Sequence, residues 1–213
     1  MNEFIGDLIE RFPELDFLSE NIEGAYRIIV KAFESGKRLY VCGNGGSAAD
    51  SEHIVGELMK GFVLKREVPS GFRERLKELY GEEGNCMADR LQQGLPAISL
   101  TGHPALSTAF SNDVASEMVF AQQVFVMGQP GDVLLAISTS GNSLNVVNAA
   151  KIAKAKGMEV IAFTGSGGGK CGGLADCLLN VPANQTFLVQ EYHLPLYHAL
   201  CLMVEDHFYG SKS

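Results

Sequence analysis

Apolar residues along this chain gather into short continuous runs, separated by longer stretches with helical periodicity. Five of the runs have the length and composition of strands that are buried on both faces. Helix-forming segments at 48–59, 116–127 and 143–156 separate most of them. Such alternation predicts an α/β fold with a doubly wound, five-stranded parallel sheet flanked by helices. The predicted strands are 38–42, 96–100, 133–138, 159–164 and 177–181.

Two further helices are predicted outside this alternation. Residues 15–35 begin just after Pro13 and carry an apolar stripe. Residues 187–208 are apolar almost all round, and Pro195 is expected to kink or start that helix. A helix without a polar face is buried in a core or against another subunit, so we expect a homo-oligomer. The chain 1–213 is expected to be one domain, with N-terminal helices at 1–35.

A segment from about 63 to 94 interrupts the pattern. Its charged part is expected to form a short helix that starts at Ser70 or Gly71, with Phe72, Leu76 and Leu79 on one face. A surface insertion of this length is tolerated, because the entropy of loop closure grows slowly with loop length. Two interpretations stay open: a solvated decoration, or a lid or subunit contact beside the functional site.

Composition and charge narrow the possible partners and compartments. The 213 residues are 46% hydrophobic and carry a formal charge of −8, which argues against nucleic acid as a partner. No apolar run approaches the roughly 20 residues that span a bilayer, and the N-terminus lacks a basic signal region. The five cysteines are scattered and odd in number, which is typical of reduced thiols in a cytoplasmic protein.

Two loops rich in glycine and hydroxyl groups are the strongest candidates for a binding site. Residues 42–50 read Cys-Gly-Asn-Gly-Gly-Ser-Ala-Ala-Asp, and residues 138–143 read Ser-Thr-Ser-Gly-Asn-Ser. Each follows a predicted strand and precedes a helix, where free backbone N–H groups can hold an anion. Ser143 by itself could be a helix cap. Four hydroxyl groups within six residues instead favour a phosphate site, at the strand ends where ligands bind on parallel sheets.

A third glycine cluster, at 165–170, lacks the spacing of a nucleotide-binding loop, so no nucleotide cofactor is expected. Polar side chains on the neighbouring helices supply candidate chemistry. His53 and Glu57 are four residues apart and share one helix face, where they could bind a divalent metal or act as acid and base. Gln190 and His198 are eight apart on the apolar C-terminal helix, where His198 could equally be a hydrogen-bonded core residue. Structural roles are expected for His103, His193 and His207.

Together these motifs resemble the sugar isomerase (SIS) domain family, and within it the phosphoheptose isomerases. The matching segments are 42–50 with His53 and Glu57, then 111–113, 130–143, 164–165 and 189–198. The resemblance covers nearly the whole chain apart from the insertion. It implies a flavodoxin-like sheet, a homotetramer, and isomerisation of sedoheptulose 7-phosphate to D-glycero-D-manno-heptose 7-phosphate.

The resemblance also implies residue roles. Glu57 and His198 match the acid–base pair, and zinc-binding positions are matched by His53, Glu57, Gln190 and His198. Isomerisation through an enediol needs one group to remove a proton and another to protonate the neighbouring oxygen, which suits a carboxylate and an imidazole. A metal would polarise the carbonyl group. Substrate contacts are implied for Asn44, Gly45, Gly46, Ser47, Glu57, Asn112, Asp113, Ser138, Thr139, Ser140, Ser143 and Gln190.

Two departures from the family pattern leave alternatives open. Relatives commonly carry an arginine–aromatic pair soon after the glutamate, whereas this chain has Lys60-Gly61-Phe62, and lysine does not replace arginine like for like. The insertion is the second departure. The chain could therefore isomerise another phosphosugar, or be a non-catalytic SIS protein that binds phosphosugars or associates with a replication initiator. The presence of all four candidate metal ligands favours catalysis.

Overall fold

The computed structural model describes residues 2–210. Its centre is a parallel sheet of five strands in the order β2-β1-β3-β4-β5, which is the flavodoxin-like order of doubly wound folds. The predicted fold class is therefore confirmed, and every predicted strand ends within one residue of its observed bounds. The strands are β1 (Leu39–Cys42), β2 (Ala97–Ser99), β3 (Val133–Ile137), β4 (Glu159–Thr164) and β5 (Cys177–Asn180).

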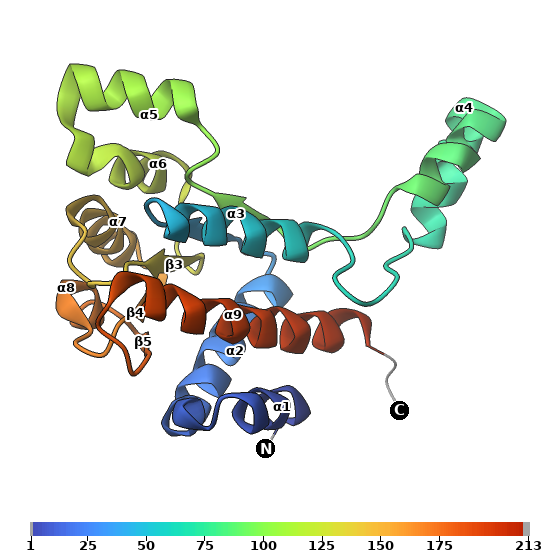
Figure 1. Cartoon of the computed structure of the whole chain (residues 1–213). Coiled ribbons are helices and arrows are strands. Elements are labelled where there is room, and N and C mark those ends of the chain that lie inside the picture. The colour runs from blue at the N-terminus through green and yellow to red at the C-terminus, as the bar shows by residue number, and fades with distance from the viewer. Residues whose placement is uncertain (1, 211–213) are drawn as a thin grey trace.

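Helices cover both faces of the sheet (Figure 1). Side chains alternate between the faces: in β1, Leu39 and Val41 enter one core cluster, while Tyr40 and Cys42 enter the other. The first face is covered by α1 (Glu3–Arg11), α2 (Ser19–Glu34), α3 (Gly46–Met59) and α9 (Thr186–Tyr209). The second is covered by α6 (Val119–Met127), α7 (Leu144–Ala155) and α8 (Gly169–Gly172).

Several helices differ from their predicted form. The predicted helix 15–35 begins as a 3-10 segment, η1 (Pro13–Leu18), before α2. The predicted helix 116–127 likewise begins as η3 (Ser116–Met118) before α6. Helix α1 lies within the predicted N-terminal helices at 1–35, whereas α5 (Pro104–Phe110) and η2 (Ser111–Ala115) occur in a segment where no helix was predicted.

The C-terminal helix α9 continues through Pro195, so the alternative that a helix starts there is wrong, while a kink stays a prediction. A proline inside a helix costs about 3 kcal/mol. Val189 and Leu196 are fully buried on either side of it, and burying each apolar side chain gains about 1.5–3 kcal/mol, so packing outweighs the lost hydrogen bond. Neither α9 nor any other helix within residues 2–210 is long and apolar enough to cross a membrane.

The insertion contains the predicted helix as part of α4 (Ser70–Arg90), which projects away from the sheet (Figure 1). The chain bends at Gly81, where the backbone has φ 58° and ψ −132°, so α4 consists of two helical arms. A Cβ atom at Gly84 would collide with the carbonyl oxygen of Leu76, which shows how closely the arms pack. Phe72 and Leu79 are about half exposed. The choice between a decoration and a lid or subunit contact stays open.

Candidate active site

The two glycine-rich loops lie at the carboxyl ends of β1 and β3, which are neighbouring parallel strands. In the first loop, Gly45 has φ 56° and ψ −120°, a conformation that other residues rarely adopt, and it leads directly into α3. The side-chain amides of Asn44 and Asn145 exchange two hydrogen bonds of 2.9 Å. The loops therefore form one continuous rim at the edge of the sheet.

The second loop keeps its helix N-terminus open. Ser143 stands at the N-cap position of α7, but its side chain makes no capping hydrogen bond. Its hydroxyl oxygen instead accepts a 2.9 Å hydrogen bond from the Ser138 hydroxyl, so the capping interpretation is wrong. No side chain caps α3 either. Both helices thus direct uncapped N-termini toward the rim, where their dipoles and N–H groups favour an anion.

Other predicted members of the loops have varied exposure. Ser47 is nearly buried, and its backbone N–H donates to the Asn44 carbonyl oxygen at 3.0 Å. Ser140 is exposed, and its hydroxyl oxygen accepts from the backbone N–H of Asn142 at 3.1 Å. Thr139 is half-buried. These contacts fix the shape of the rim and leave hydroxyl groups at its surface.

Helices α3 and α9 pack against each other below the rim. His53 and Glu57 lie one turn apart on the same face of α3, as predicted from their spacing. His53 Nε2 lies 3.2 Å from Glu57 Oε1, and His53 Nδ1 lies 2.9 Å from the Tyr197 hydroxyl oxygen. The Tyr197 hydroxyl also donates to Asp50 Oδ1 at 3.3 Å. His53 is therefore held at both ring nitrogens.

His198 joins this cluster from α9. Its ring centroid is 5.1 Å from that of His53, with the planes at 83°, and 5.6 Å from that of Phe62. Its Nε2 atom is buried and has no hydrogen-bond partner within residues 2–210. Burial and the neighbouring His53 lower the pKa of His198, although Glu57 opposes the shift. A neutral imidazole with an unpaired nitrogen can move a proton or bind a metal.

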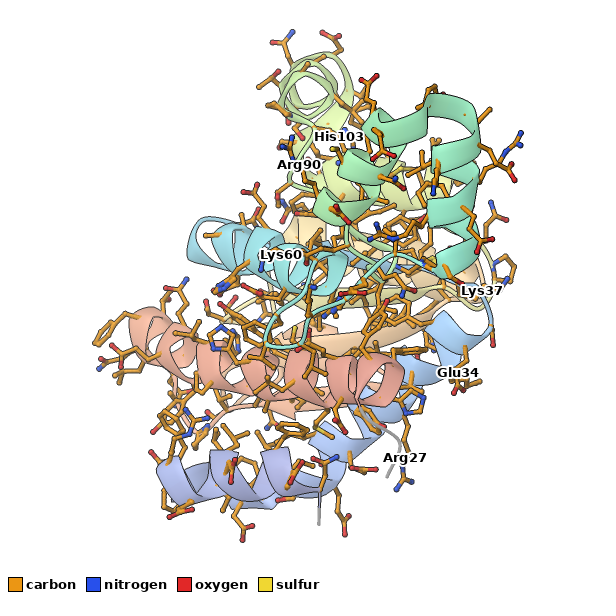
Figure 2. The ribbon with its side chains drawn as sticks, turned by 90° about the vertical axis from the view of Figure 1, so that its right-hand side faces the viewer. Arg27, Glu34, Lys37, Lys60, Arg90 and His103 are labelled. Carbon is orange, nitrogen blue, oxygen red and sulfur yellow. The ribbon has the colours of Figure 1, made fainter. Side chains whose placement is uncertain are left out.

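Glu57 has a second partner in Lys60, which follows the end of α3 (Figure 2). Lys60 Nζ lies 2.9 Å from Glu57 Oε2. The Glu57 side chain is only 13% exposed, so the carboxylate is enclosed between an imidazole and an ammonium group. Lys60 thus supplies a cation beside the candidate base.

The four predicted metal ligands are only partly assembled. Their donor types suit zinc. The buried Nε2 of His198 has no hydrogen-bond partner within residues 2–210, so its lone pair is available to a metal. A Cβ atom at Gly46 would collide with Gln190 Nε2, which places the Gln190 amide at the first loop, about two helical turns before His53. Within residues 2–210, no three His, Cys, Asp or Glu side chains form a ready metal site. The residues fit a metal by type, with Gln190 apart from the others.

Asn112 and Asp113 lie on η2, at a distance along the chain from both loops. Both are exposed, and the Asn112 amide donates to Asp113 Oδ1 at 2.9 Å. Among the residues that the structure describes, no hydrogen bond links these two side chains to the rim. Their predicted contact with substrate stays a prediction.

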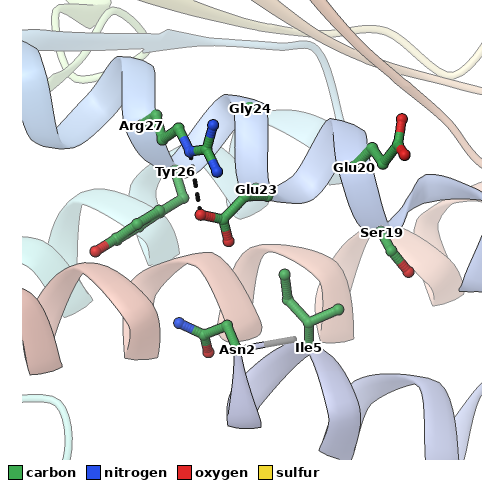
Figure 3. A pocket seen from close by; sticks show the side chains of 8 residues that line it. All are labelled: Asn2, Ile5, Ser19, Glu20, Glu23, Gly24, Tyr26 and Arg27. Atoms are coloured by element: carbon green, nitrogen blue, oxygen red, sulfur yellow. Dashed lines mark hydrogen bonds and ion pairs between the residues drawn. The ribbon is translucent and has the colours of Figure 1, made fainter.

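A separate groove lies between α1 and α2, on the other side of α9 from α3 (Figures 1 and 3). Its polar lining includes the Arg27–Glu23 ion pair at 3.2 Å. Arg27 is largely exposed, and an exposed pair of this kind contributes little energy. The groove contains none of the predicted site residues, and the candidate chemistry stays with α3 and α9.

Sequence reasoning missed three polar residues of the site. Tyr197 lies in a run of apolar residues on α9 that is typical of core packing. Asp50 could have been found from its spacing, because it precedes His53 by three residues on the same helix. Asn145 gives no signal, since its partner Asn44 is 101 residues away in the chain.

Comparison with known proteins gives consistent matches. The chain matches the family model described as SIS domain over residues 3–71 and 76–165. It is 40% identical over 201 residues to the phosphoheptose isomerase of Thiobacillus denitrificans, covering 92% of this chain and 87% of that protein. The phosphoheptose isomerase of Synechocystis is 38% identical over 192 residues, covering 90% and 86%.

Solved structures agree with these matches. The phosphoheptose isomerase of Neisseria gonorrhoeae superposes with a TM-score of 0.74 at 33% identity, covering 94% of both chains. That of Francisella tularensis gives a TM-score of 0.73 at 30% identity, covering 96% of both chains. Sequence and fold therefore point to the same group of proteins.

Proposed function

The chain belongs to the SIS domain family, and from that membership we propose that it is an aldose–ketose isomerase that converts sedoheptulose 7-phosphate to D-glycero-D-manno-heptose 7-phosphate. The names of the relatives support the substrate. The observation that carries the proposal is the meeting of Glu57, His53 and His198 beside the rim formed by the two glycine-rich loops. Folding brings these groups together from opposite ends of the chain.

In this proposal the rim holds the phosphate of the substrate. The N-termini of α3 and α7 supply backbone N–H groups, and Ser138 and Ser143 supply hydroxyl groups. The phosphate has to be bound by these nearby groups, because a chain with a net charge of −8 does not attract an anion through its overall field. Anchoring at the rim would extend the sugar along α3 and α9 toward Glu57, which turns the reaction into an intramolecular one.

The chemical step is assigned to Glu57 and His198. Glu57 removes a proton from C1 of the ketose, the electrons of that bond form the C1–C2 double bond, and His198 protonates the C2 oxygen to give the enediol. Glu57 then returns the proton to C2 while His198 removes the proton from the C1 hydroxyl, which leaves the C1 aldehyde. Acid–base groups placed in this way contribute about 10²- to 10⁴-fold in rate.

Zinc is part of the proposal because the donor types fit. His53, Glu57, Gln190 and His198 would hold it, with a change in the Gln190 side chain from its place at Gly46. When bound, zinc supplies a Lewis acid that polarises the substrate carbonyl. Equilibrium dialysis tests this independently of turnover: the wild-type chain should bind one zinc ion, and His198→Ala should bind it more weakly. Equal binding by both would remove His198 from the ligand set.

A second copy of the chain is proposed to cover the site, within a homotetramer. Phe187 is 58% exposed and Leu194 is 42% exposed, and both flank Gln190 and His198 on α9. Because these exposed apolar side chains lie beside a reaction that needs protection from water, we propose that another subunit packs over them and excludes water from the site. A cytoplasmic location is also proposed, since the five cysteines are free thiols and four of them are buried.

Turnover with defined substrates tests the function. Purified protein with zinc should convert sedoheptulose 7-phosphate to the aldose at least tenfold faster than it isomerises a six-carbon ketose phosphate. Faster turnover of the six-carbon sugar would indicate an isomerase of another phosphosugar. A thermal shift with sedoheptulose 7-phosphate but no turnover of any sugar would indicate a non-catalytic binding protein.

A further inference from the structure

The segment 60–66, called the strap here, lies against the C-terminal part of α9 on its way from α3 to α4, and a buried carboxylate holds it there. The Glu205 side chain is fully buried. Its oxygens accept hydrogen bonds from the backbone N–H groups of Phe62 at 2.8 Å, Val63 at 2.9 Å and Leu64 at 3.2 Å. One side chain on α9 therefore binds three consecutive amides of the strap.

Arg66 completes this anchor and is itself fully buried. Its guanidinium lies 2.8 Å from Glu205 Oε1 and stacks 4.6 Å from the centre of the Tyr209 ring. It also donates to the backbone carbonyl oxygens of Leu58 at 2.8 Å and Glu57 at 3.2 Å. Arg66 thus connects the strap, α9 and the last turn of α3, which is the turn that carries Glu57.

The other edge of the strap is bound by the segment that returns from the insertion. The backbone N–H of Gly61 donates to Gln92 Oε1 at 2.7 Å. The backbone N–H of Gln93 donates to the Arg66 carbonyl oxygen at 2.8 Å. With contacts on both edges, the strap has one defined conformation.

That conformation places two side chains of the strap against the candidate catalytic residues His198 and Glu57. The Phe62 ring packs against the His198 ring at 5.6 Å, and Lys60 contacts Glu57 at 2.9 Å. We propose that Glu205, acting through the strap, is a positioning residue that sets Phe62 against His198 and Lys60 against Glu57. The inference rests on the proposed isomerase function and adds a residue that touches neither substrate nor reacting atoms.

Electrostatics supports a positioning role over a purely stabilising one. Burial raises the pKa of Glu205, but the N–H groups of Val63 and Phe62 and the Arg66 guanidinium outweigh it, so the pKa lies below its usual value and the carboxylate is charged. Replacing a buried ion pair by apolar residues is often neutral or stabilising. A fully hydrogen-bonded charge instead fixes one arrangement of its neighbours.

The test compares Glu205→Gln with Asp132→Asn. Asp132 is an equally buried carboxylate that accepts hydrogen bonds from the backbone N–H groups of Arg38 and Gln129 at 2.9 and 2.8 Å, at the amino ends of the neighbouring strands β1 and β3. Both variants lose buried hydrogen bonds, but only Glu205→Gln loosens the strap. The readouts are kcat and KM for sedoheptulose 7-phosphate, and the NMR signals of the His198 ring, which the Phe62 ring current shifts.

We expect Glu205→Gln to lower kcat by about 10- to 100-fold with little change in KM and to move the His198 signals, because small misplacements cost about 10²-fold. Asp132→Asn should change kcat less than about threefold and leave those signals in place. Equal losses of kcat in both variants, or unmoved His198 signals in Glu205→Gln, would overturn the inference.

A second variant covers the case in which Glu205→Gln fails to fold. Phe62→Leu removes the ring from His198 and leaves the buried pair intact, so its kcat should fall in the same way. An unchanged kcat in Phe62→Leu would then overturn the inference. A wild-type protein without turnover would contradict the proposed function alone, since the His198 signals would still report whether Glu205 positions Phe62.

Discussion

Asn44 and Asn145 exchange two amide hydrogen bonds of 2.9 Å, which join the loop after β1 to the first turn of α7. Asn44 belongs to the first glycine-rich loop, and Asn145 is the second residue of the helix that follows the second loop. Each loop alone leads into an uncapped helix, and the amide pair sets the distance between the two N-termini. The pair therefore defines the width of the rim that the two loops form.

Breaking the pair should weaken substrate binding more than chemistry. For Asn145→Ala we expect KM for sedoheptulose 7-phosphate to rise about tenfold with kcat changed less, because one to two hydrogen bonds of ordinary strength are lost. Steady-state kinetics gives both constants. Asn148→Ala is the matched control, since Asn148 lies on the same helix and donates to the Glu117 carbonyl oxygen at 3.1 Å. Equal effects of both variants would contradict this role.

The hydroxyl pair of the second loop should act on the phosphate directly. Ser143→Ala removes the acceptor of the Ser138 hydroxyl and a group at the N-terminus of α7. Hydrogen bonds to charged groups are worth about 1.5–3 kcal/mol, so inhibition by inorganic phosphate should weaken by about 10- to 100-fold. Ser19→Ala on α2 should leave the inhibition constant unchanged. Unaltered inhibition in Ser143→Ala would place the phosphate elsewhere.

His193 should make the protein sensitive to acid. It is fully buried, and burial lowers its pKa to about 4, although the Thr164 carbonyl oxygen 3.4 Å away opposes the shift. Below its ordinary value of about 6.5, the unfolded chain takes up a proton that the folded chain refuses until about pH 4. The free energy of unfolding should therefore fall as the pH is lowered from 6.5 to 4, by up to roughly 3 kcal/mol from this group.

Urea unfolding at pH 7 and pH 4.5 measures this effect. Other carboxylates and histidines titrate in the same range, so the comparison is between wild type and His193→Gln. The wild type should lose more stability than the variant between the two pH values. Parallel losses would show that His193 does not titrate as its burial indicates.

The apolar face of α9 should hold copies of the chain together. Leu194→Asp places a charge between Gln190 and His198 on the exposed side of that helix, and a buried charge without a partner disrupts an interface. Sedimentation velocity should show an oligomer for the wild type and smaller species for the variant. Phe125→Asp, on the exposed part of α6, should sediment as the wild type does. A wild-type monomer at micromolar concentration would remove the proposed cover.

Much of the fold was predictable because strands buried on both faces consist of continuous runs of apolar residues, which can be recognised in the sequence. The run before Cys42 and the run before Ser138 are apolar throughout, and the loops that follow them occur where predicted. A helix start at Pro195 was a wrong alternative, because the free-energy cost of a proline inside a helix can be read from the sequence. The packing of Val189 and Leu196 that offsets this cost cannot. Local propensity yielded to tertiary contacts there.

The site was predictable to the extent that its parts are local. His53 and Glu57 share a helix, so their contact follows from spacing. The strap was not predictable, because the segment containing Arg66 looks like a charged surface loop, whereas Arg66 is fully buried against Glu205, 139 residues away. Long-range pairing of buried charges depends on the completed fold, which a single sequence does not display.

The central claim is that Glu57 moves a proton between carbons 1 and 2 of the sugar. Proton NMR of sedoheptulose 7-phosphate with the wild type and with Glu57→Gln measures this directly, with Glu52→Gln on the same helix as the control. The wild type and the control should produce the anomeric signal of the aldose, and Glu57→Gln should produce it at least about 100-fold more slowly while still binding the sugar. No aldose signal from the wild type, or an equal rate in Glu57→Gln, would contradict the account.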